Sequence, residues 1–439
     1  MPRPLVLALA ALLAPLAAAQ PALLSSFEMS GTSHPFDDLG LAIEAATVVP
    51  GGVVVATATA DTLYVAHLTG AGVTWRRAHF IRFDGATPDL SLRALDGGIA
   101  VGLGYAGPDG YAGLDNADAE EGVYDRISGS GLRLDAEGHA VFQTVMLAGG
   151  FPPALRDAPG LPEPWEERLQ GVYGIDGGWL LVTEGSLTAT GPDSSEVRVG
   201  GLSVARYGDD GKRLWDTPIG AQPGLDLFLG PEVRLTPTAL LVGLDTRLSA
   251  QGVTVGQVAV GAVDLETGAA RAAFAPLTVS GEEAAEMAAL GSDASGAPVW
   301  HTVRTSSEST TTGSRRDRRV TRTTYTQRHA VHREGAEPLA WTEETGEGVV
   351  FPHMRMCEGS GTRQLVGRWT QPAVELAIRD LTSDDPAATT PVATFPEVGR
   401  PTYVRLLACG EDGDTLWALA RLQNFNTGQT STRLIHVAP

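Results

Sequence analysis

The stretch GGWLLVTEG at Gly177–Gly185 recurs along the chain in altered form. It is an apolar run of strand length that follows a turn containing Asp176. Six further runs are of the same kind: Gly51–Thr59 (GGVVVATAT), Gly97–Tyr105 (GGIAVGLGY), Thr238–Thr246 (TALLVGLDT), Gly296–Arg304 (GAPVWHTVR), Thr362–Thr370 (TRQLVGRWT) and Asp414–Leu422 (DTLWALARL). The starts lie 46, 80, 61, 58, 66 and 52 residues apart, so one unit repeats about every 60 residues.

Each unit continues beyond its recurrent strand in the same order. A second strand, a glycine-containing turn and a last strand near an aromatic residue follow, as in Leu202–Tyr207, Gly208–Gly211 and Trp215. A strand group at this period predicts small sheets stacked around a common axis, which is a β-propeller. We predict an all-β fold: a seven-bladed propeller of four-stranded antiparallel blades. Six or eight blades are the alternatives.

The seventh unit lacks its last strand. After its recurrent run, Ser431–Val437 is the one strand that remains before the chain stops. Ala22–Met29 (ALLSSFEM) precedes the first unit and has no partner of its own. Pairing these two strands would close the ring and remove its exposed edges. We therefore predict that Phe27 takes the place that Trp75 or Trp215 holds in other units.

The N-terminal residues resemble a secretory signal. Arg3 precedes the apolar run Leu5–Leu16, and Ala17–Ala19 offers small residues for cleavage near Ala19-Gln20. The run is too short to span a membrane, and no later stretch approaches spanning length. We expect a signal peptide at 1–19, a single propeller domain at 20–439, and a secreted or periplasmic protein.

Three segments interrupt the repeat: an acidic insertion at 107–122, a proline-rich connector at 149–167, and a polar, threonine-rich stretch at 305–333. The alternation in 305–333 predicts a long projecting hairpin. In the acidic insertion, Asp115, Asp118 and Glu120 are weak candidates for a calcium site. Their spacing does not reproduce the calcium-loop pattern, so a solvated surface loop is the favoured interpretation.

The predicted hairpin is basic within an acidic protein. The formal net charge of the chain is −20, yet His301–Arg333 carries eight arginines against Glu308 and Asp317. Arginine forks suit carboxylates, phosphates and sulfates. An acidic glycan, the headgroup surface of an envelope membrane or the acidic patch of a protein partner would fit, and a surface hairpin without a partner is the alternative. The candidate binding residues are Arg315, Arg316, Arg318, Arg319 and Arg322.

The two cysteines occupy equivalent positions in consecutive units. Cys357 lies five residues before Thr362, and Cys409 lies five residues before Asp414. Neighbouring blades would bring such positions together, and an exported protein meets an oxidising compartment. We predict a disulfide, with two buried free thiols as the alternative.

Two segments resemble a known repeat. Val204–Trp215 (VARYGDDGKRLW) is similar to the turn-and-tryptophan segment of quinoprotein-type (PQQ-like) propeller repeats, and Ala262–Gly268 (AVDLETG) resembles part of it. The Asp-Gly-Gly turns at 96–98 and 176–178 look like those of secreted bacterial propellers with strand-opening DGG repeats. The resemblance covers two units well and departs from the pattern at Ala272. It implies the fold, but such repeats occur in dehydrogenases and in assembly scaffolds alike.

The sequence points to binding more than to chemistry. The acidic surface disfavours nucleic acid and anionic lipid, and the zinc-protease, nucleophile-elbow and phosphate-loop motifs are absent. We predict a non-catalytic propeller for binding or scaffolding in the cell envelope, monomeric and without a cofactor. A quinoprotein-like oxidoreductase or a polysaccharide-active propeller enzyme is the alternative.

Overall fold

The computed structural model describes most of the chain between Ala22 and Ala438. The described residues are 22–29, 34–81, 88–104, 126–149, 166–190, 196–223, 225–227, 232–250, 253–271, 285–293, 295–312, 320–345, 352–359, 362–370, 372–424 and 426–438. The expected signal segment 1–19 and the acidic insertion 107–122 lie outside these residues, and so does the proline-rich connector 149–167 except at its ends.

The first three blades follow the chain order from a short 3₁₀ helix, η2 (Asp37–Leu39). Blade 1 consists of β2 (Ala45–Val49), β3 (Gly52–Ala58), β4 (Thr62–Thr69) and β5 (Gly72–Phe80). Blade 2 consists of β6 (Asp89–Leu95), β7 (Gly98–Gly104), β8 (Arg126–Asp135) and β9 (Ala140–Gly149). Blade 3 consists of β10 (Glu166–Ile175), β11 (Gly178–Thr190), β12 (Glu196–Gly208) and β13 (Arg213–Pro223).

The innermost strand of blade 4 is divided into two pieces, which both pair with the next strand. Blade 4 consists of β14 (Leu225–Leu227), β15 (Glu232–Leu235), β16 (Ala239–Ala250), β17 (Val253–Asp264) and β18 (Ala270–Arg271). Blade 5 consists of β19 (Ala285–Ser292), β20 (Pro298–Thr312), β21 (Val320–Arg333) and β22 (Leu339–Thr345). Blade 6 consists of β23 (His353–Met356), β24 (Arg363–Trp369), β25 (Ala373–Asp380) and β26 (Thr390–Pro396).

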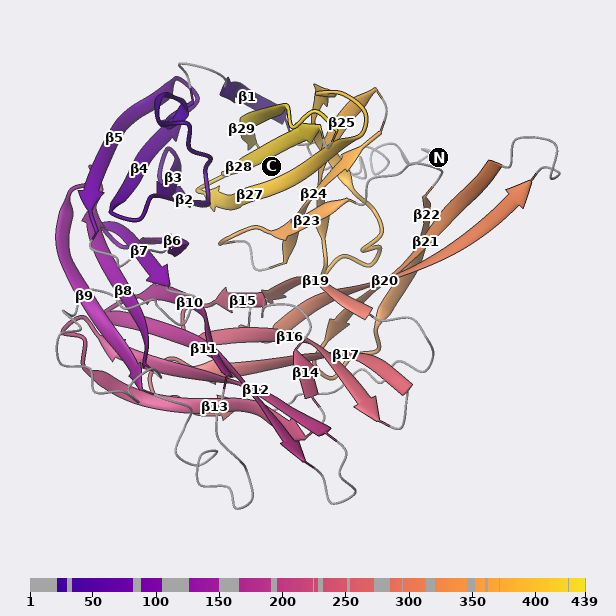
Figure 1. Cartoon of the computed structure of the whole chain (residues 1–439). Coiled ribbons are helices and arrows are strands. Elements are labelled where there is room, and N and C mark those ends of the chain that lie inside the picture. The colour runs from indigo at the N-terminus through magenta and orange to yellow at the C-terminus, as the bar shows by residue number, and fades with distance from the viewer. Residues whose placement is uncertain are drawn as a thin grey trace, which may run out of the picture.

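Blade 7 is built from both ends of the described chain. It consists of β27 (Thr402–Asp412), β28 (Thr415–Asn424), β29 (Thr430–Ala438) and, as its outer strand, β1 (Ala22–Met29). β1 pairs with β29 antiparallel, and Phe27 lies opposite Leu434. The Phe27 ring also lies against Gly72 in the next blade, where an added Cβ would be 3.6 Å from it. The seven-bladed ring and its closure by the N-terminal strand are therefore confirmed (Figure 1).

Apolar side chains fill the spaces between blades rather than a single central core. A cluster of buried residues lies between every pair of neighbouring blades. Trp179 of blade 3 is fully buried against blade 2, where a Cβ at Gly131 would meet its indole ring at 2.3 Å. The tryptophan in this recurrent strand therefore packs between blades, and the glycine opposite it makes room for the ring.

The two faces of the ring differ in their connections. The turns from first to second strands and from third to fourth strands are mostly short, with glycines at positive φ such as Gly51 (80°) and Gly268 (72°). Because successive strands are antiparallel, these turns share one face, which we call the tight-turn face. The second-to-third connections and the links between blades share the opposite, long-connection face. Its longest connections span residues 105–125, 150–165 and 272–284.

Candidate functional site

Three long hairpins leave the ring on the long-connection face. They join the second and third strands of blades 3, 4 and 5, and their strands are 12 to 15 residues long, compared with 7 and 8 residues in blade 1. The β20–β21 hairpin is paired without interruption from Val299 opposite Arg333 to Thr312 opposite Val320. Figure 1 shows it extending well beyond the ring.

The predicted binding arginines belong to this hairpin. Arg322 lies in β21 opposite Thr310. Arg315, Arg316, Arg318 and Arg319 fall in the segment 313–319, outside the described residues. Their role in binding stays a prediction, and so does that of Arg322.

A cluster of polar side chains is buried at the base of the hairpin, between blades 5 and 6. We define the polar cluster as His301, His329, Glu343, Gln364 and Arg379. His301, His329, Gln364 and Arg379 are at most 1% exposed. The apolar cluster at the same interface is small: its buried members among the described residues are Ala289, Val299, Val331, Met356 and Leu381. A polar network thus supplies part of the contact between these two blades.

A chain of hydrogen bonds connects Gln364 to the ring nitrogens of the two histidines. The Gln364 amide nitrogen lies 3.2 Å from His301 Nδ1, and His301 Nε2 lies 3.1 Å from His329 Nδ1. If the amide donates to Nδ1, both imidazoles are neutral and carry their protons on Nε2. The His329 proton then points toward Glu343, whose Oε2 lies 3.9 Å from Nε2.

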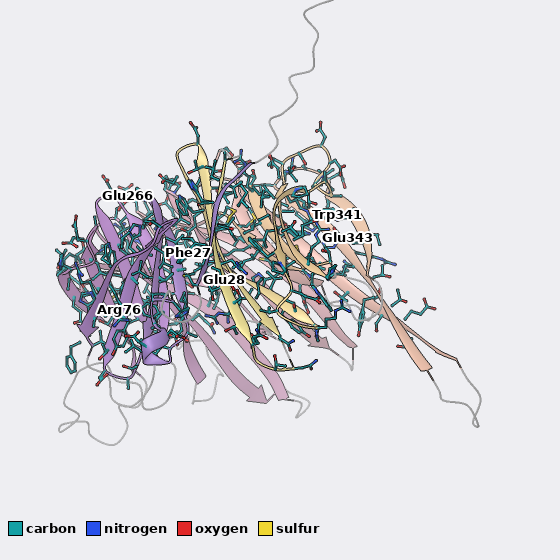
Figure 2. All side chains as sticks on the ribbon, turned by 90° about the horizontal axis from the view of Figure 1, so that it is seen from above. Phe27, Glu28, Arg76, Glu266, Trp341 and Glu343 are labelled. Atoms are coloured by element: carbon teal, nitrogen blue, oxygen red, sulfur yellow. A yellow bond between two sulfur atoms is a disulfide. The ribbon has the colours of Figure 1, made fainter. Side chains whose placement is uncertain are left out.

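Glu343 closes the polar cluster on its other side. Its Oε1 accepts hydrogen bonds from the Arg379 guanidinium at 2.9 Å and from the Trp341 indole at 3.0 Å. Trp341 stacks on His329 with ring centroids 4.9 Å apart, and the Arg379 guanidinium lies 4.8 Å from the Trp341 ring. Trp341 and Glu343 lie together on one edge of the ring (Figure 2).

Burial controls the protonation of these groups. It lowers the pKa of His301 well below its usual value, and the nearby His329 and Arg379 act in the same direction. The pKa of His329 is also lowered by burial, against the attraction of Glu343. Burial opposes ionisation of Glu343, but the Trp341 hydrogen bond and the Arg379 guanidinium leave its pKa below the usual range. The polar cluster therefore holds neutral histidines beside a carboxylate–guanidinium pair.

A cavity of about 540 Å³ lies on the axis of the ring. First strands of five blades, β2, β6, β15, β23 and β27, provide most of its wall, and Tyr173 of β10 adds to it. Its charged lining residues are Glu44, Arg93, Arg234, Arg355, Glu358 and Glu411. The volume is within the range of small-molecule sites.

The end of β23 and the residues just after it form part of the cavity wall. Side chains of blades 4 and 1 donate hydrogen bonds to them. Arg234 of blade 4 donates to the carbonyl oxygens of Met356 at 3.5 Å and of Cys357 at 2.5 Å. Thr47 of blade 1 donates to Glu358 Oε2 at 3.0 Å. Hydrogen bonds from distant parts of the sequence thus hold this wall in place.

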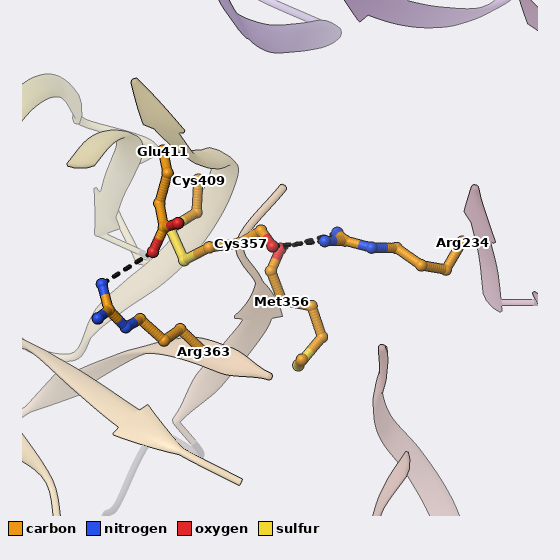
Figure 3. Close-up of a disulfide and its surroundings, with 6 residues drawn as sticks. All are labelled: Arg234, Met356, Cys357, Arg363, Cys409 and Glu411. Carbon is orange, nitrogen blue, oxygen red and sulfur yellow. Dashed lines mark hydrogen bonds and ion pairs between the residues drawn. A yellow bond between two sulfur atoms is a disulfide. The ribbon is translucent and has the colours of Figure 1, made fainter. Parts of the chain in front are cut away.

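Cys357 and Cys409 form the predicted disulfide (Figure 3). The bond joins blade 6 to blade 7 beside the axial cavity. Two backbone hydrogen bonds accompany it, from Glu358 N to the Cys409 carbonyl at 2.7 Å and from Glu411 N to the Glu358 carbonyl at 3.0 Å. Arg363 and Glu411 add an ion pair of 2.8 Å. The equivalent positions of the cysteines in the repeat were therefore a correct guide to their pairing.

The described residues hold no group of three histidine, cysteine, aspartate or glutamate side chains arranged to bind a metal ion. The calcium candidates Asp115, Asp118 and Glu120 lie outside those residues. None of the helical segments in the described ranges has the length and apolar character needed to cross a bilayer.

Sequence reasoning missed the polar cluster. His329 and His332 lie on opposite faces of β21, as their spacing predicts, since His329 stacks on Trp341 and His332 on Trp300. A basic residue does recur at one place in the third strand of five units, but none of the five belongs to the polar cluster, so this regularity does not point to it. These residues are His67, Arg133, Arg206, His332 and His436, each opposite the second apolar position of the recurrent strand.

Fold and axial cavity place this chain among the seven-bladed β-propellers. No protein-family model and no curated protein matches it significantly. A Trypanosoma rangeli sialidase bound to the inhibitor DANA is similar at 10% identity and a TM-score of 0.35, over 90% of this chain and 54% of the sialidase. A Synechocystis apocarotenoid oxygenase mutant is similar at 12% identity and a TM-score of 0.34, over 94% of this chain and 85% of the oxygenase.

The chain thus spans about half the length of that sialidase structure. A Xanthomonas citri GH43_1 enzyme complexed with xylotriose is similar at 14% identity and a TM-score of 0.25, over 60% of this chain and 85% of the enzyme. Likenesses this weak carry no argument about activity, which has to come from the residues of this chain.

Proposed function

We propose that this chain is an exported, non-catalytic binding or scaffold protein that holds an anionic partner on its long-connection face. The observation that supports this function is the asymmetry of the ring. The long hairpins of blades 3, 4 and 5 leave the same face, while the opposite face is built mostly from short turns. Long loops on one side of a rigid scaffold are where binding residues usually concentrate.

Charge indicates what kind of partner the β20–β21 hairpin would meet. The chain carries a formal net charge of −20, but five arginines lie between Arg315 and Arg322. A concentrated positive charge attracts an acidic glycan or the acidic patch of an envelope protein, while the acidic remainder of the surface discourages non-specific contact. Export is supported by the disulfide and by the signal-like residues 1–19.

Changing Arg315, Arg316, Arg318 and Arg319 together to Ser should weaken retention on a heparin or acidic-glycan column. We expect elution at a clearly lower salt concentration, because each lost guanidinium removes one anion contact. The thermal unfolding midpoint should stay within about 2 °C of the wild type, as expected for surface substitutions.

A matched pair of variants separates local recognition from net charge. Arg318→Ser/Arg319→Ser removes two positive charges from the hairpin, and Lys212→Ser/Arg213→Ser removes two from the exposed turn that leads into β13 on the tight-turn face. The hairpin variant should shift elution and the control should not. Equal shifts for both variants, or no shift for either, would contradict the proposed function.

A further inference from the structure

The charged groups around the axial cavity differ in how they are compensated. The three carboxylates have partners within the protein: Glu411 is paired with Arg363, Glu358 accepts from the Thr47 hydroxyl, and Glu44 accepts from the Ala58 backbone N–H at 3.4 Å. None of these three partners lines the cavity itself. Each carboxylate therefore has a hydrogen-bond donor, although only Glu411 is paired with a positive charge.

Positive charge in the cavity is compensated less completely. Arg93 donates to the carbonyl oxygen of Gly174 at 3.2 Å, and a carbonyl satisfies a hydrogen bond without neutralising a charge. The side chain of Arg355 makes no hydrogen bond or ion pair with the residues that the structure describes. Both arginines are among the residues that line the cavity, where Arg234 provides a third positive charge.

The surroundings of Arg93 indicate the same imbalance. Burial lowers its pKa, although the carboxylates of Glu358 and Asp176 are close enough to act in the opposite direction. The free-energy cost of desolvating this guanidinium is therefore larger than its stabilisation by the nearby carboxylates. An oxyanion in the cavity would supply the missing counter-charge and accept several charge-assisted hydrogen bonds.

We propose that the axial cavity binds a small molecule through a carboxylate or phosphate group, with Arg93 and Arg355 as the residues that recognise the anion. This site is separate from the proposed face-binding function, since it concerns a small ligand inside the ring. A cavity of about 540 Å³ has room for more than the anionic group, so the remainder of the ligand would lie against the apolar lining residues Val48, Leu92 and Leu235.

The test uses inorganic phosphate and succinate as probes in calorimetric titrations of the whole protein, with sodium chloride at matched ionic strength as the blank. Saturable one-to-one binding of either probe supports the proposal. Preference for phosphate identifies a phosphate ligand, and preference for succinate identifies a carboxylate ligand. Absence of saturable binding by both probes overturns it.

Three arginine variants locate the site. Arg355→Gln should weaken binding of the better probe roughly tenfold or more, because a charged hydrogen bond contributes about 1.5–3 kcal/mol. Arg93→Gln should act in the same way. The control is Arg405→Gln, an exposed arginine on the cavity-lining strand β27 that does not line the cavity, and it should change binding less than twofold.

The use of two arginine variants keeps the result interpretable if one of them disturbs the fold. Arg93 holds a hydrogen bond between blades 2 and 3, so its substitution could disturb the fold. Arg355 has no such bond among the described residues. If Arg93→Gln does not fold, the result for Arg355→Gln alone decides whether the assignment holds. Equal weakening by Arg405→Gln and Arg355→Gln would show a general charge effect and overturn the assignment. Since hairpin and cavity variants use different probes, failure here is distinguishable from failure of the face-binding proposal.

Discussion

Acidification from pH 7 to pH 4 should remove much of the stability of this protein, well before its hydrogen-bonded aspartates are protonated. Burial lowers the pKa of His332 to about 4, with a smaller contribution from Arg304. Burial likewise lowers the pKa of His353 to about 4, with Arg355 and Arg405 acting in the same direction. His301 and His329 in the polar cluster shift the same way.

The direction of the effect follows from proton binding. Below its ordinary pKa of about 6.5 a histidine in the unfolded chain takes up a proton, while these buried histidines stay neutral until about pH 4. The unfolded state therefore binds more protons, and stability declines as the pH falls through this window. The loss is about 3 kcal/mol for each histidine when the shift is 2.5 pKa units. Aspartates with lowered pKa, such as Asp293 and Asp380, lose their contribution below pH 3.8.

Urea unfolding followed by fluorescence at pH 7, 6, 5 and 4.5 would measure this decline. His332→Gln/His353→Gln should flatten the dependence of the unfolding free energy on pH. His139, which is 59% exposed, supplies the control, and His139→Gln should leave the dependence unchanged. A wild-type free energy that stays constant between pH 7 and pH 4.5 would contradict the prediction, and so would equal flattening by the control.

Loss of the Cys357–Cys409 bond should cost about 4 kcal/mol of unfolding free energy. The two cysteines are 52 residues apart, and the chain-entropy model gives about 4 kcal/mol for a loop of this length. For a domain of this size the thermal midpoint should fall by about 5 °C. Blades 6 and 7 should nevertheless stay docked, because Glu358, Arg363 and Glu411 keep their contacts across the interface.

Two measurements separate the cross-link from the packing of its sulfur atoms. The reduced wild type keeps both sulfur atoms and loses only the bond, while Cys357→Ala/Cys409→Ala loses both. Both forms should be destabilised, and a reducing agent should have no effect on the alanine variant. A reduced wild type within about 1 kcal/mol of the oxidised protein would refute the cross-link as a source of stability.

Repetition explains why the fold could be predicted from one sequence. Recurrent runs such as Gly177–Gly185 repeat at a period that remains recognisable even where a single strand is ambiguous. The seventh unit is incomplete, which identifies β1 as its missing strand. The disulfide was predictable for the same reason, because equivalent positions in consecutive units become neighbours in the ring. The acidic insertion, which carried the predicted metal residues, and the segment 313–319, which carried four of the five predicted binding arginines, lie outside the described residues.

The polar cluster and the axial cavity could not be predicted in the same way. Gln364 and His301 are 63 residues apart, and Arg234 and Cys357 are 123 residues apart. The local sequence around a single histidine or arginine does not predict which neighbouring blade its side chain contacts. Periodicity records what each unit repeats, whereas these sites are made of residues that differ from unit to unit.

The sequence by itself determined the strands, the seven units, the closure of the ring and the pairing of the cysteines, since the hydrophobic period and the turn residues recur from unit to unit. Only the tertiary structure decided that His301, His329 and Arg379 share one buried space and that Arg93 and Arg355 line one cavity. The physical reason is that the ring packs neighbouring blades face to face and brings the first strands of different blades to a common axis. Neither arrangement has a counterpart along the chain.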